Sequence, residues 1–413
     1  MNELLSLFDG LVGLFTVEGV KMILMWVIGG TLIYLAIKKQ MEPTLLLPIG
    51  FGAILMNFPG VVSESVHKVC AICGETVGGT AVNECCLDAA HIVEKTVYGG
   101  IAEPLHELYN AGIANELFPL LLFIGIGAMI DFGPLLSNPK IMIFGAAAQF
   151  GIFFTLCMAS VFFPNIKDAA SISIIGAADG PTSIVVANAL GSKYVGAITV
   201  AAYSYMALVP IIQPPVIKLL TTKSERRIRM PYEAKSVSKT TKILFPIIIS
   251  VVACIFAPSA GSLIGFLMFG NLIRECGVLD SLSETAQKVL ANLVTIFLGI
   301  TIAFNMHASQ FLALETLLIM GLGLVAFIVD TAGGVLFAKL YNIIMRILGK
   351  PLINPMIGAA GISAFPMSGR IVHKLGLEED NQNFLLMHSI GVNVSGQIAS
   401  VIAGALILGF FGA

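Results

Sequence analysis

The segment IIGAADGPTSI, at residues 174–184, decides the fold because it sets helix-breaking residues beside an acid within a long apolar run. Gly180 and Pro181 interrupt a regular helix, since glycine loosens the backbone and proline lacks an amide hydrogen. A second segment, MIGAAGISAFP at 356–366, shares the IGAA core. The pair predicts two broken elements, and the first of them carries Asp179.

The composition around these segments is that of a membrane protein. Of the 413 residues, 12% are charged, whereas soluble domains hold about a quarter. With 57% apolar residues the chain could not cover a soluble surface, and its formal net charge of −2 gives no general attraction for nucleic acid. At about 20 residues per crossing, there is room for roughly ten membrane-spanning helices. Apolar runs lie at 20–37, 44–58, 117–135, 141–163, 171–190, 194–217, 243–257, 261–274, 289–306, 312–345, 352–369 and 383–412.

The basic residues indicate which of these runs cross the membrane completely. Basic loops face the cytoplasm, which assigns Lys38, Lys140 and the segment 218–242 to that side. If both 171–190 and 194–217 crossed, the basic segment would lie outside. The conflict disappears if 171–190 is a re-entrant hairpin.

The second broken segment follows the same logic, and the two halves of the chain resemble each other. Lys350 and Arg370 flank the run 352–369, so we expect it to enter and leave on the cytoplasmic side. FIGIGAMIDF at 123–132 is similar to FLGITIAFNM at 297–306. Chance similarity among small-residue membrane segments is the alternative, but the matched order of segments favours an internal repeat.

The expected fold is an all-α polytopic membrane protein with two inverted-topology repeats of about five helices, each with a broken or re-entrant hairpin. Residues 1–217 form the first predicted repeat, with a lead-in, an external loop at 59–116 and the hairpin 171–190. Residues 218–242 form a cytoplasmic basic linker, and 243–413 form the second repeat with the other hairpin.

The external loop 59–116 contains Cys70, Cys73, Cys85 and Cys86. The vicinal pair departs from the usual spacing of zinc sites, and an oxidising exterior favours one or two disulfides. A metal or cluster site, and free thiols in an anaerobic organism, are the alternatives.

Asp179 is the most unusual polar residue, because a carboxylate at membrane depth is costly unless it has a partner. Thr182 and Ser183 add hydroxyl groups beside it, and the broken backbone exposes carbonyl groups. An all-oxygen set with one acid suits a hard monovalent cation such as Na+. The alternative is a structural role, in which Asp179 caps the broken helix.

Further polar groups lie in the second broken segment. Asn354, Ser363 and Ser368 are found there, and Gly358 allows a close approach of the backbone. Arg370 at the cytoplasmic mouth is either an interfacial anchor or a bidentate ligand for a carboxylate.

The long helices of the chain carry the remaining candidates. Tyr203 and Tyr205 precede a proline-rich end, which favours a lined cavity over an interfacial belt. Asp330 is a second intramembrane acid, and its small neighbours favour a role in helix packing. The last helix carries polar residues at Asn393, Ser395, Gln397 and Ser400.

Four long motifs cover these positions: GAADGPTSI (176–184), AAYSYMALVPIIQPP (201–215), NPMIGAAGISAFPMSGR (354–370) and NFLLMHSIGVNVSG (383–396). With them the chain resembles, almost from end to end, the beta subunit of sodium-translocating carboxylic acid decarboxylases. This membrane subunit is shared by oxaloacetate, methylmalonyl-CoA, glutaconyl-CoA and malonate decarboxylase complexes.

The resemblance implies an activity and a set of partners. A biotin carrier delivers carboxybiotin to the beta subunit, which releases CO2 with uptake of a proton and exports Na+. The implied partners are a carboxyltransferase/biotin carrier subunit, a small membrane subunit and further copies of the chain, in the bacterial cytoplasmic membrane. The carboxyltransferase subunit selects the carboxylic acid.

The resemblance also implies roles for individual residues, carried over motif by motif. Asp179, Tyr205, Ser363 and Arg370 are expected to act in catalysis, with Arg370 on the carboxylate of carboxybiotin and Tyr205 as a proton relay. The expected Na+ ligands from the resemblance are Asp179, Asn354, Gly358, Ser363 and Asn393. Thr182, whose hydroxyl group lies beside Asp179 in the same motif, is added to them.

Two other functions compete with this interpretation. A stand-alone Na+/H+ exchanger or a Na+-coupled carboxylate transporter could use the same inverted repeats. A structural membrane anchor would leave Asp179 unexplained. The sequence contains no biotin-accepting Met-Lys-Met and no P-loop lysine motif, so we expect decarboxylation to require partner subunits.

Overall fold

The computed structural model describes residues 14–40, 43–59, 62–70, 92–100, 102–231, 237–256, 258 and 261–412. Within these residues, six helices are long and apolar enough to span a membrane, or seven if the bent pair Glu103–Ala114 and Leu117–Met129 forms one span. The six are Val17–Lys39, Pro139–Phe162, Val195–Leu220, Asp280–Met306, Leu314–Ile347 and Leu386–Phe411. The prediction of a helical, multi-pass membrane protein is confirmed.

The first half of the chain has two long helices with shorter ones between them, and one short helix follows. Its helices are α3 (Val17–Lys39), α4 (Pro43–Leu55), α5 (Ala102–Tyr109), η3 (Asn110–Ala114), α6 (Leu117–Met129), α7 (Gly133–Ser137), η4 (Pro139–Ile141), α8 (Met142–Ala148), α9 (Phe150–Phe162), α10 (Ile166–Ser173), η5 (Ile174–Ala177), α11 (Gly180–Ala189), α12 (Val195–Leu220) and α13 (Lys223–Arg226). Helix α3 ends at Gln40 in the left-handed conformation, directly after the basic pair Lys38 and Lys39.

The second half has a similar series of helices. They are α14 (Lys239–Phe256), α15 (Gly261–Glu275), α16 (Asp280–Glu284), η7 (Thr285–Leu290), α17 (Ala291–Ile302), η8 (Ala303–Met306), α18 (Ala308–Phe311), α19 (Leu314–Ile347), η9 (Pro355–Gly361), α20 (Met367–Glu379) and α21 (Leu386–Phe411). Helix α19 has 34 residues. At 1.5 Å per residue it is about 50 Å long, more than the roughly 30 Å hydrocarbon core of a bilayer.

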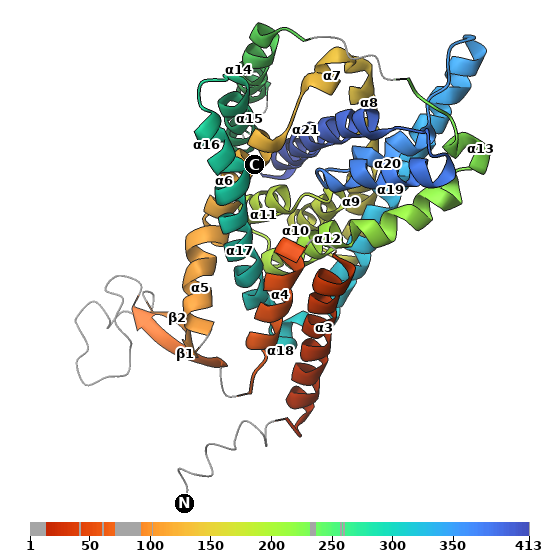
Figure 1. Ribbon diagram of the computed structural model, residues 1–413. Helices are drawn as coiled ribbons and strands as arrows, with labels where there is room; N and C mark the ends of the chain where they lie inside the picture. Colours follow the sequence, from red (N-terminus) through yellow and green to blue (C-terminus); the bar gives the residue numbers. More distant parts are fainter. Residues whose placement is uncertain are drawn as a thin grey trace, which may run out of the picture.

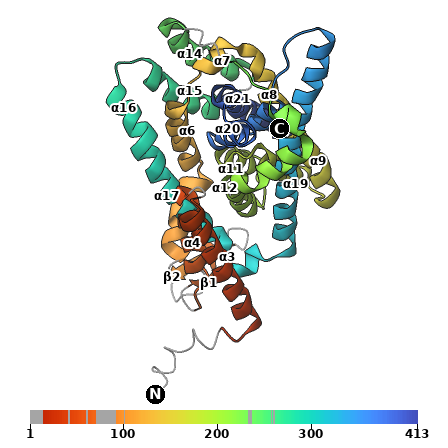
Figure 2. The same cartoon turned by 45° about the vertical axis from the view of Figure 1, so that its right-hand side comes forward.

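The helices form two groups that stand side by side (Figure 2). The first group joins α3, α4, α6, α14, α15 and α17 through successive contacts. The second group joins α8 to α12 with α19, α20 and α21. Helix α13 lies at the upper right in Figure 1, and the N-terminal end of α3 lies near the bottom of the molecule.

Helices at equivalent places in the two halves make equivalent contacts. In the first group, α3, α4 and α6 of the first half correspond to α14, α15 and α17 of the second half. The contact of α3 with α4 corresponds to that of α14 with α15, and the contact of α4 with α17 corresponds to that of α15 with α6. In the second group, α12 packs on α19 as α21 packs on α8, and α11 packs on α12 as α20 packs on α21. Both groups therefore contain helices from both halves of the chain.

The first broken segment turns back on itself. After η5, Ala178 adopts a left-handed conformation with φ of 52°, and α11 begins at Gly180. Ser192 Oγ, which follows α11, donates a hydrogen bond of 2.6 Å to Asp168 Oδ1 in the first turn of α10. Because the two ends of the segment touch, the chain returns to the level at which it began. We name α10, η5 and α11 (166–189) hairpin 1.

The second broken segment also returns to its starting level. The amide groups of Asn354, before η9, and Asn383, after α20, both donate to the carbonyl oxygen of Arg226 at 2.8 Å. We name η9 and α20 (355–379) hairpin 2. It is longer than the predicted hairpin 352–369, because α20 continues through a polar stretch that hydropathy does not include.

The run 141–163, expected as one helix, is interrupted between α8 and α9. At the break, Gln149 Nε2 donates to the carbonyl oxygen of Gly361 in hairpin 2 at 3.3 Å. Asp330 of α19 accepts a hydrogen bond from the amide of Gly151, at the start of α9. The interruption thus supplies two hydrogen-bond donors: the Gln149 side chain for hairpin 2 and the Gly151 amide for the buried Asp330 carboxylate.

The loop at 59–116, predicted to be external, contains two strands, which the all-α expectation did not include. Strands β1 (Val62–Cys70) and β2 (Ile92–Gly100) pair in antiparallel register, with Val62 opposite Gly100 (Figure 1). Strand β1 contains Val62, Val66 and Val69, and β-branched residues of this kind favour extended backbone. The disulfide and metal hypotheses involve Cys73, Cys85 and Cys86, which lie outside the described residues, as does the lead-in up to residue 13.

Candidate functional site

Asp179 lies at the break in hairpin 1, where it forms the N-cap of α11. Its Oδ1 accepts a hydrogen bond of 3.3 Å from the amide of Thr182. The capping role considered from the sequence is therefore present in the structure. The side chain is only 3% exposed, and a carboxylate so deeply buried requires further partners.

Side-chain donors converge on the other oxygen of this carboxylate. Asp179 Oδ2 accepts hydrogen bonds from Thr182 Oγ1 at 2.8 Å and from Ser363 Oγ at 3.2 Å. Gln397 Nε2 and Ser400 Oγ, both on α21, donate to the same oxygen at 3.0 Å. The donors come from hairpin 1, hairpin 2 and α21, so this oxygen joins three elements that lie far apart in the sequence.

The two hairpins also meet directly beside the carboxylate. The backbone amide of Ser363 donates to the carbonyl oxygen of Ala177 at 3.1 Å. The hydroxyl oxygens of Ser400 and Ser363 lie 2.9 Å apart, within hydrogen-bond distance. The two segments that share the IGAA core are thus in contact through their broken ends.

Gln397 and Ser400 are absent from the site residues predicted from the motifs. A signal for them exists in the sequence, because Asn393, Gln397 and Ser400 follow one another at spacings of four and three. Residues at these spacings share one face of a helix. All three are buried in α21.

Asn393 lies on this face beside hairpin 2. Its Nδ2 donates to the carbonyl oxygen of Ile362 at 2.8 Å. Its Oδ1 is buried and has no hydrogen-bond partner among the described residues. A buried acceptor without a donor costs free energy, so this oxygen is available to a ligand.

A cavity of about 300 Å³ opens onto the carboxylate. Its polar lining residues are Thr44, Asp179, Tyr203, Asn292, Thr295, Ser363, Arg370 and Gln397. Arg370 is exposed and forms no ion pair within the described part of the chain, whereas Arg226 and Arg229 each pair with an acid. Its guanidinium group is free to bind an anion at the rim of the cavity.

Three predicted site residues lie elsewhere. Tyr205 donates its hydroxyl hydrogen to the carbonyl oxygen of Met320 on α19. Asn354 caps η9 and binds the linker backbone at Arg226. Gly358 packs against α19 so closely that a side-chain carbon there would overlap the α19 backbone. None of the three lines the cavity.

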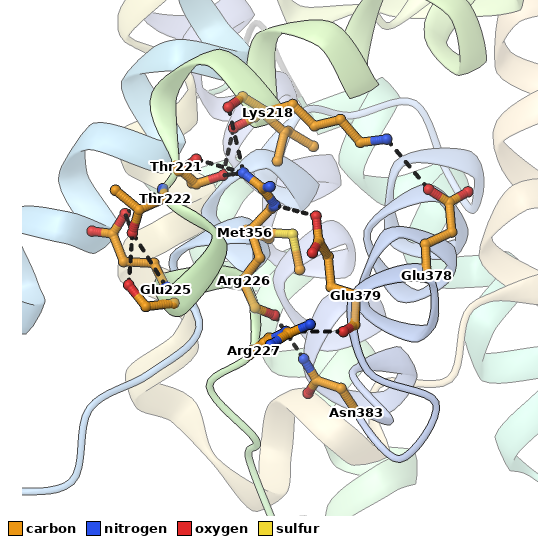
Figure 3. Close-up of polar contacts among 12 residues, drawn as sticks. Lys218, Thr221, Thr222, Glu225, Arg226, Arg227, Met356, Glu378, Glu379 and Asn383 are labelled. Atoms are coloured by element: carbon orange, nitrogen blue, oxygen red, sulfur yellow. Dashed lines mark hydrogen bonds and ion pairs between the residues drawn. The ribbon is translucent and has the colours of Figure 1, made fainter.

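The basic segment that follows α12 is clamped against the end of hairpin 2 (Figure 3). Arg226 binds Glu379 at 2.7 Å, and Arg229 binds Asp380 at 2.6 Å. The hydrogen bond from Arg226 lowers the pKa of the Glu379 carboxyl, and the hydrogen bond from Arg229 lowers that of Asp380. These contacts hold the end of α20 against the segment that follows α12. The clamp also includes an ion pair of 3.4 Å between Lys218 and Glu378.

Fold and site together define a multi-pass membrane protein in which two broken hairpins enclose one buried carboxylate. Over residues 21–411 the chain matches the family described as the Na+-transporting oxaloacetate decarboxylase beta subunit, and it belongs to that family. The predicted function, that of the membrane beta subunit of a Na+-transporting, biotin-dependent decarboxylase, is confirmed by this membership, and a stand-alone exchanger is not favoured.

Relatives with different substrates are similar along almost their whole length. The chain is 46% identical over 394 residues to the methylmalonyl-CoA decarboxylase subunit beta of Propionigenium modestum, covering 94% of this chain and 95% of the relative. It is 44% identical over 434 residues to the oxaloacetate decarboxylase beta chain of Klebsiella pneumoniae, covering 99% of both. It is 45% identical over 388 residues to the glutaconyl-CoA decarboxylase subunit beta of Acidaminococcus fermentans, covering 94% and 92%.

Proposed function

We propose that this chain binds Na+ at Asp179 and exports it, driven by the decarboxylation of carboxybiotin. The observation that carries the proposal is the convergence of three hydroxyl groups and one amide on a single buried carboxylate oxygen. A hydroxyl group that donates to the carboxylate can rotate and turn its lone pairs toward a cation. The same groups can therefore serve both an empty and an occupied site.

In this proposal the Na+ ligands are oxygen atoms of Asp179, Thr182, Ser363 and Asn393. The unpartnered Oδ1 of Asn393 supports its role, because a cation would satisfy that buried acceptor. Ser400 adds a hydroxyl group to the same cluster.

The resemblance implies that Asn354 and Gly358 are Na+ ligands. In the proposal they instead hold hairpin 2 in position. Asn354 fixes the start of η9 on the linker backbone, at Arg226 and Ile228. Gly358 permits the contact of η9 with α19 at Gly334. Both contacts set the position of the loop that carries Ser363.

At the cytoplasmic mouth, Arg370 binds the carboxylate group of carboxybiotin through its planar fork. Decarboxylation breaks the bond between the carboxylate carbon and the ureido nitrogen, CO2 leaves, and the nitrogen takes up a proton. This proton first replaces Na+ at Asp179 and then reaches the ureido nitrogen through the hydroxyl group of Tyr205. Since the Tyr205 hydroxyl group binds the Met320 carbonyl oxygen in this structure, the relay requires that contact to open.

The proposal includes two inverted repeats, at 1–217 and 243–413, joined by the linker 218–242, with hairpins 1 and 2 re-entrant. The equivalent contacts of α3 with α4 and α14 with α15, and of α12 with α19 and α21 with α8, support this symmetry. Broken elements that meet between inverted repeats are the usual ion sites of secondary transporters.

The proposed assembly contains a carboxyltransferase/biotin carrier subunit, a small membrane subunit and several copies of this chain, in the bacterial cytoplasmic membrane. Family membership supports partner subunits. After detergent extraction, capture on avidin should retain the untagged chain together with a biotinylated carrier.

The direct test of the function is decarboxylation of free carboxybiotin by the purified complex, with and without Na+, and uptake of radioactive Na+ into inside-out vesicles. We expect both activities to require Na+ and the carrier subunit. A Na+ gradient formed by the purified chain without any carrier would contradict the proposal and support an exchanger.

A further inference from the structure

A buried hydroxyl group beside Asp179 has no role in the proposed function. Tyr203 of α12 is 0% exposed, and its hydroxyl oxygen has no hydrogen-bond partner among the described residues. Leaving a buried polar atom unpaired costs about 1–3 kcal/mol. The side chain lines the cavity that reaches Asp179, so the unpaired oxygen belongs to a place that a ligand can occupy.

The position of this tyrosine is set by hairpin 1. A side-chain carbon at Gly180 would overlap the Tyr203 ring, so the ring lies directly against the residue that follows Asp179. Tyr205, two residues later, faces α19 instead. Of the tyrosine pair, Tyr203 is the one that faces the carboxylate cavity.

A second helix, α17, contributes further polar residues to the lining of the cavity. Asn292 and Thr295 lie on α17, inside a candidate membrane span, and both line the cavity with Tyr203. Asn292 is exposed and makes no hydrogen bond within the described part of the chain. A strongly polar side chain at membrane depth is costly unless it faces water or a partner. Contact with lipid therefore does not explain why an asparagine occupies position 292.

The lining of the cavity includes residues that lie near basic side chains or carry one. Thr44, in the first turn of α4 just after the basic end of α3, lines it together with Arg370. Basic ends face the cytoplasm. A cation that moves through this cavity to Asp179 therefore passes the side chains of Tyr203 and Asn292, which both line it.

We propose that the Tyr203 hydroxyl oxygen and the Asn292 side-chain oxygen form a vestibule site for a partly hydrated Na+ ion on its way to Asp179. The inference rests on the proposed function, in which Na+ reaches Asp179 from the cytoplasm. Both ligands are neutral oxygens, which suits a weak site that an ion enters and leaves rapidly. The cavity volume of about 300 Å³ leaves room for the water molecules that complete the coordination of the ion.

The first test measures Na+-dependent decarboxylation by the purified complex with Tyr203→Phe, Asn292→Leu and the double variant. Loss of one neutral ligand should raise the half-saturating Na+ concentration about three- to tenfold, with little change in the rate at saturating Na+. Because both side chains act on one ion, the double variant should show less than the product of the two single effects. Tyr341→Phe is the matched control, since that ring packs on Phe144 outside the cavity.

The second test measures binding without turnover, as the rise in unfolding temperature when Na+ replaces K+ at constant ionic strength. In an Asp179→Asn background a weak Na+ effect should remain, and adding Tyr203→Phe should remove it. If Asn292→Leu fails to fold, Asn292→Ser takes its place. A well-folded Tyr203→Phe variant with unchanged half-saturating Na+, or a fully multiplicative double variant, would overturn the vestibule site. Normal Na+ dependence of the Asp179→Asn variant alone would instead overturn the proposed function.

Discussion

Replacing Asp179 by asparagine should abolish Na+-dependent decarboxylation. Asparagine has nearly the same shape and is also a good N-cap, so α11 should still form. What the variant loses is one negative charge at a site that is 3% exposed. Two unit charges about 4 Å apart at an effective dielectric constant near 20 attract each other by about 4 kcal/mol, which corresponds to about a thousandfold in affinity.

The assay is decarboxylation of free carboxybiotin by the purified complex over a series of Na+ concentrations. Asp330→Asn is the matched control, because Asp330 is equally buried but binds the start of α9 outside the cavity. We expect this control to lower stability and to keep the Na+ dependence. An unchanged half-saturating Na+ concentration in Asp179→Asn would refute the assignment of the ion site.

Three further changes test the frame, the mouth and the clamp. Gly358→Val should lower the unfolding temperature in scanning calorimetry, because its side chain overlaps the backbone of Gly334 and overpacking costs about 1–3 kcal/mol; an unchanged temperature would contradict the packing. Arg370→Lys keeps the charge but loses the fork, so the KM for carboxybiotin should rise in the decarboxylation assay while half-saturating Na+ stays constant; the reverse pattern would place Arg370 in the ion site. The Arg226 hydrogen bond lowers the folded-state pKa of Glu379, so its stabilising effect is present above the unfolded pKa of about 4.3 and is lost as the pH falls through the lower folded value. Thermal unfolding of Glu379→Gln and of the unchanged protein should therefore differ at neutral pH and converge in acid; a difference that persists in acid would have another origin.

The sequence predicts the main parts of the site but not how they are joined. Asp179 and the two broken segments are visible because glycine, proline and a carboxylate interrupt apolar runs, and a carboxylate at membrane depth is rarely retained without a functional partner. Gln397 and Ser400 are harder to predict, because polar residues on a membrane helix often bind only their own backbone. Their link to Asp179 spans more than two hundred residues, and no local pattern contains it.

The elements that lie outside the apolar runs are difficult to predict for a different reason. Hydropathy follows apolar runs, so it ends hairpin 2 near residue 369, although α20 continues to Glu379. What extends the helix is the linker, whose Arg226 binds Glu379 across a long separation in sequence. The strands β1 and β2 lie in a polar loop, where hydropathy makes no distinction between strand and coil.

The distribution of ion pairs indicates where the molecule can move. In the described residues, the pairs between separate elements join members of the same helix group: Arg226 to Glu379 in the group of the hairpins, and Lys242 to Glu275 in the group of α6, α14 and α15. The boundary between the groups contains the cavity at Asp179 and no such pair. Both ends of hairpin 2 bind the carbonyl oxygen of Arg226, in the segment that follows α12, so hairpin 2 cannot shift without α12. In the proposed mechanism, the hairpin group slides against α4, α6 and α17 with these pairs intact, and this movement changes which side of the membrane reaches the carboxylate, as alternating access requires.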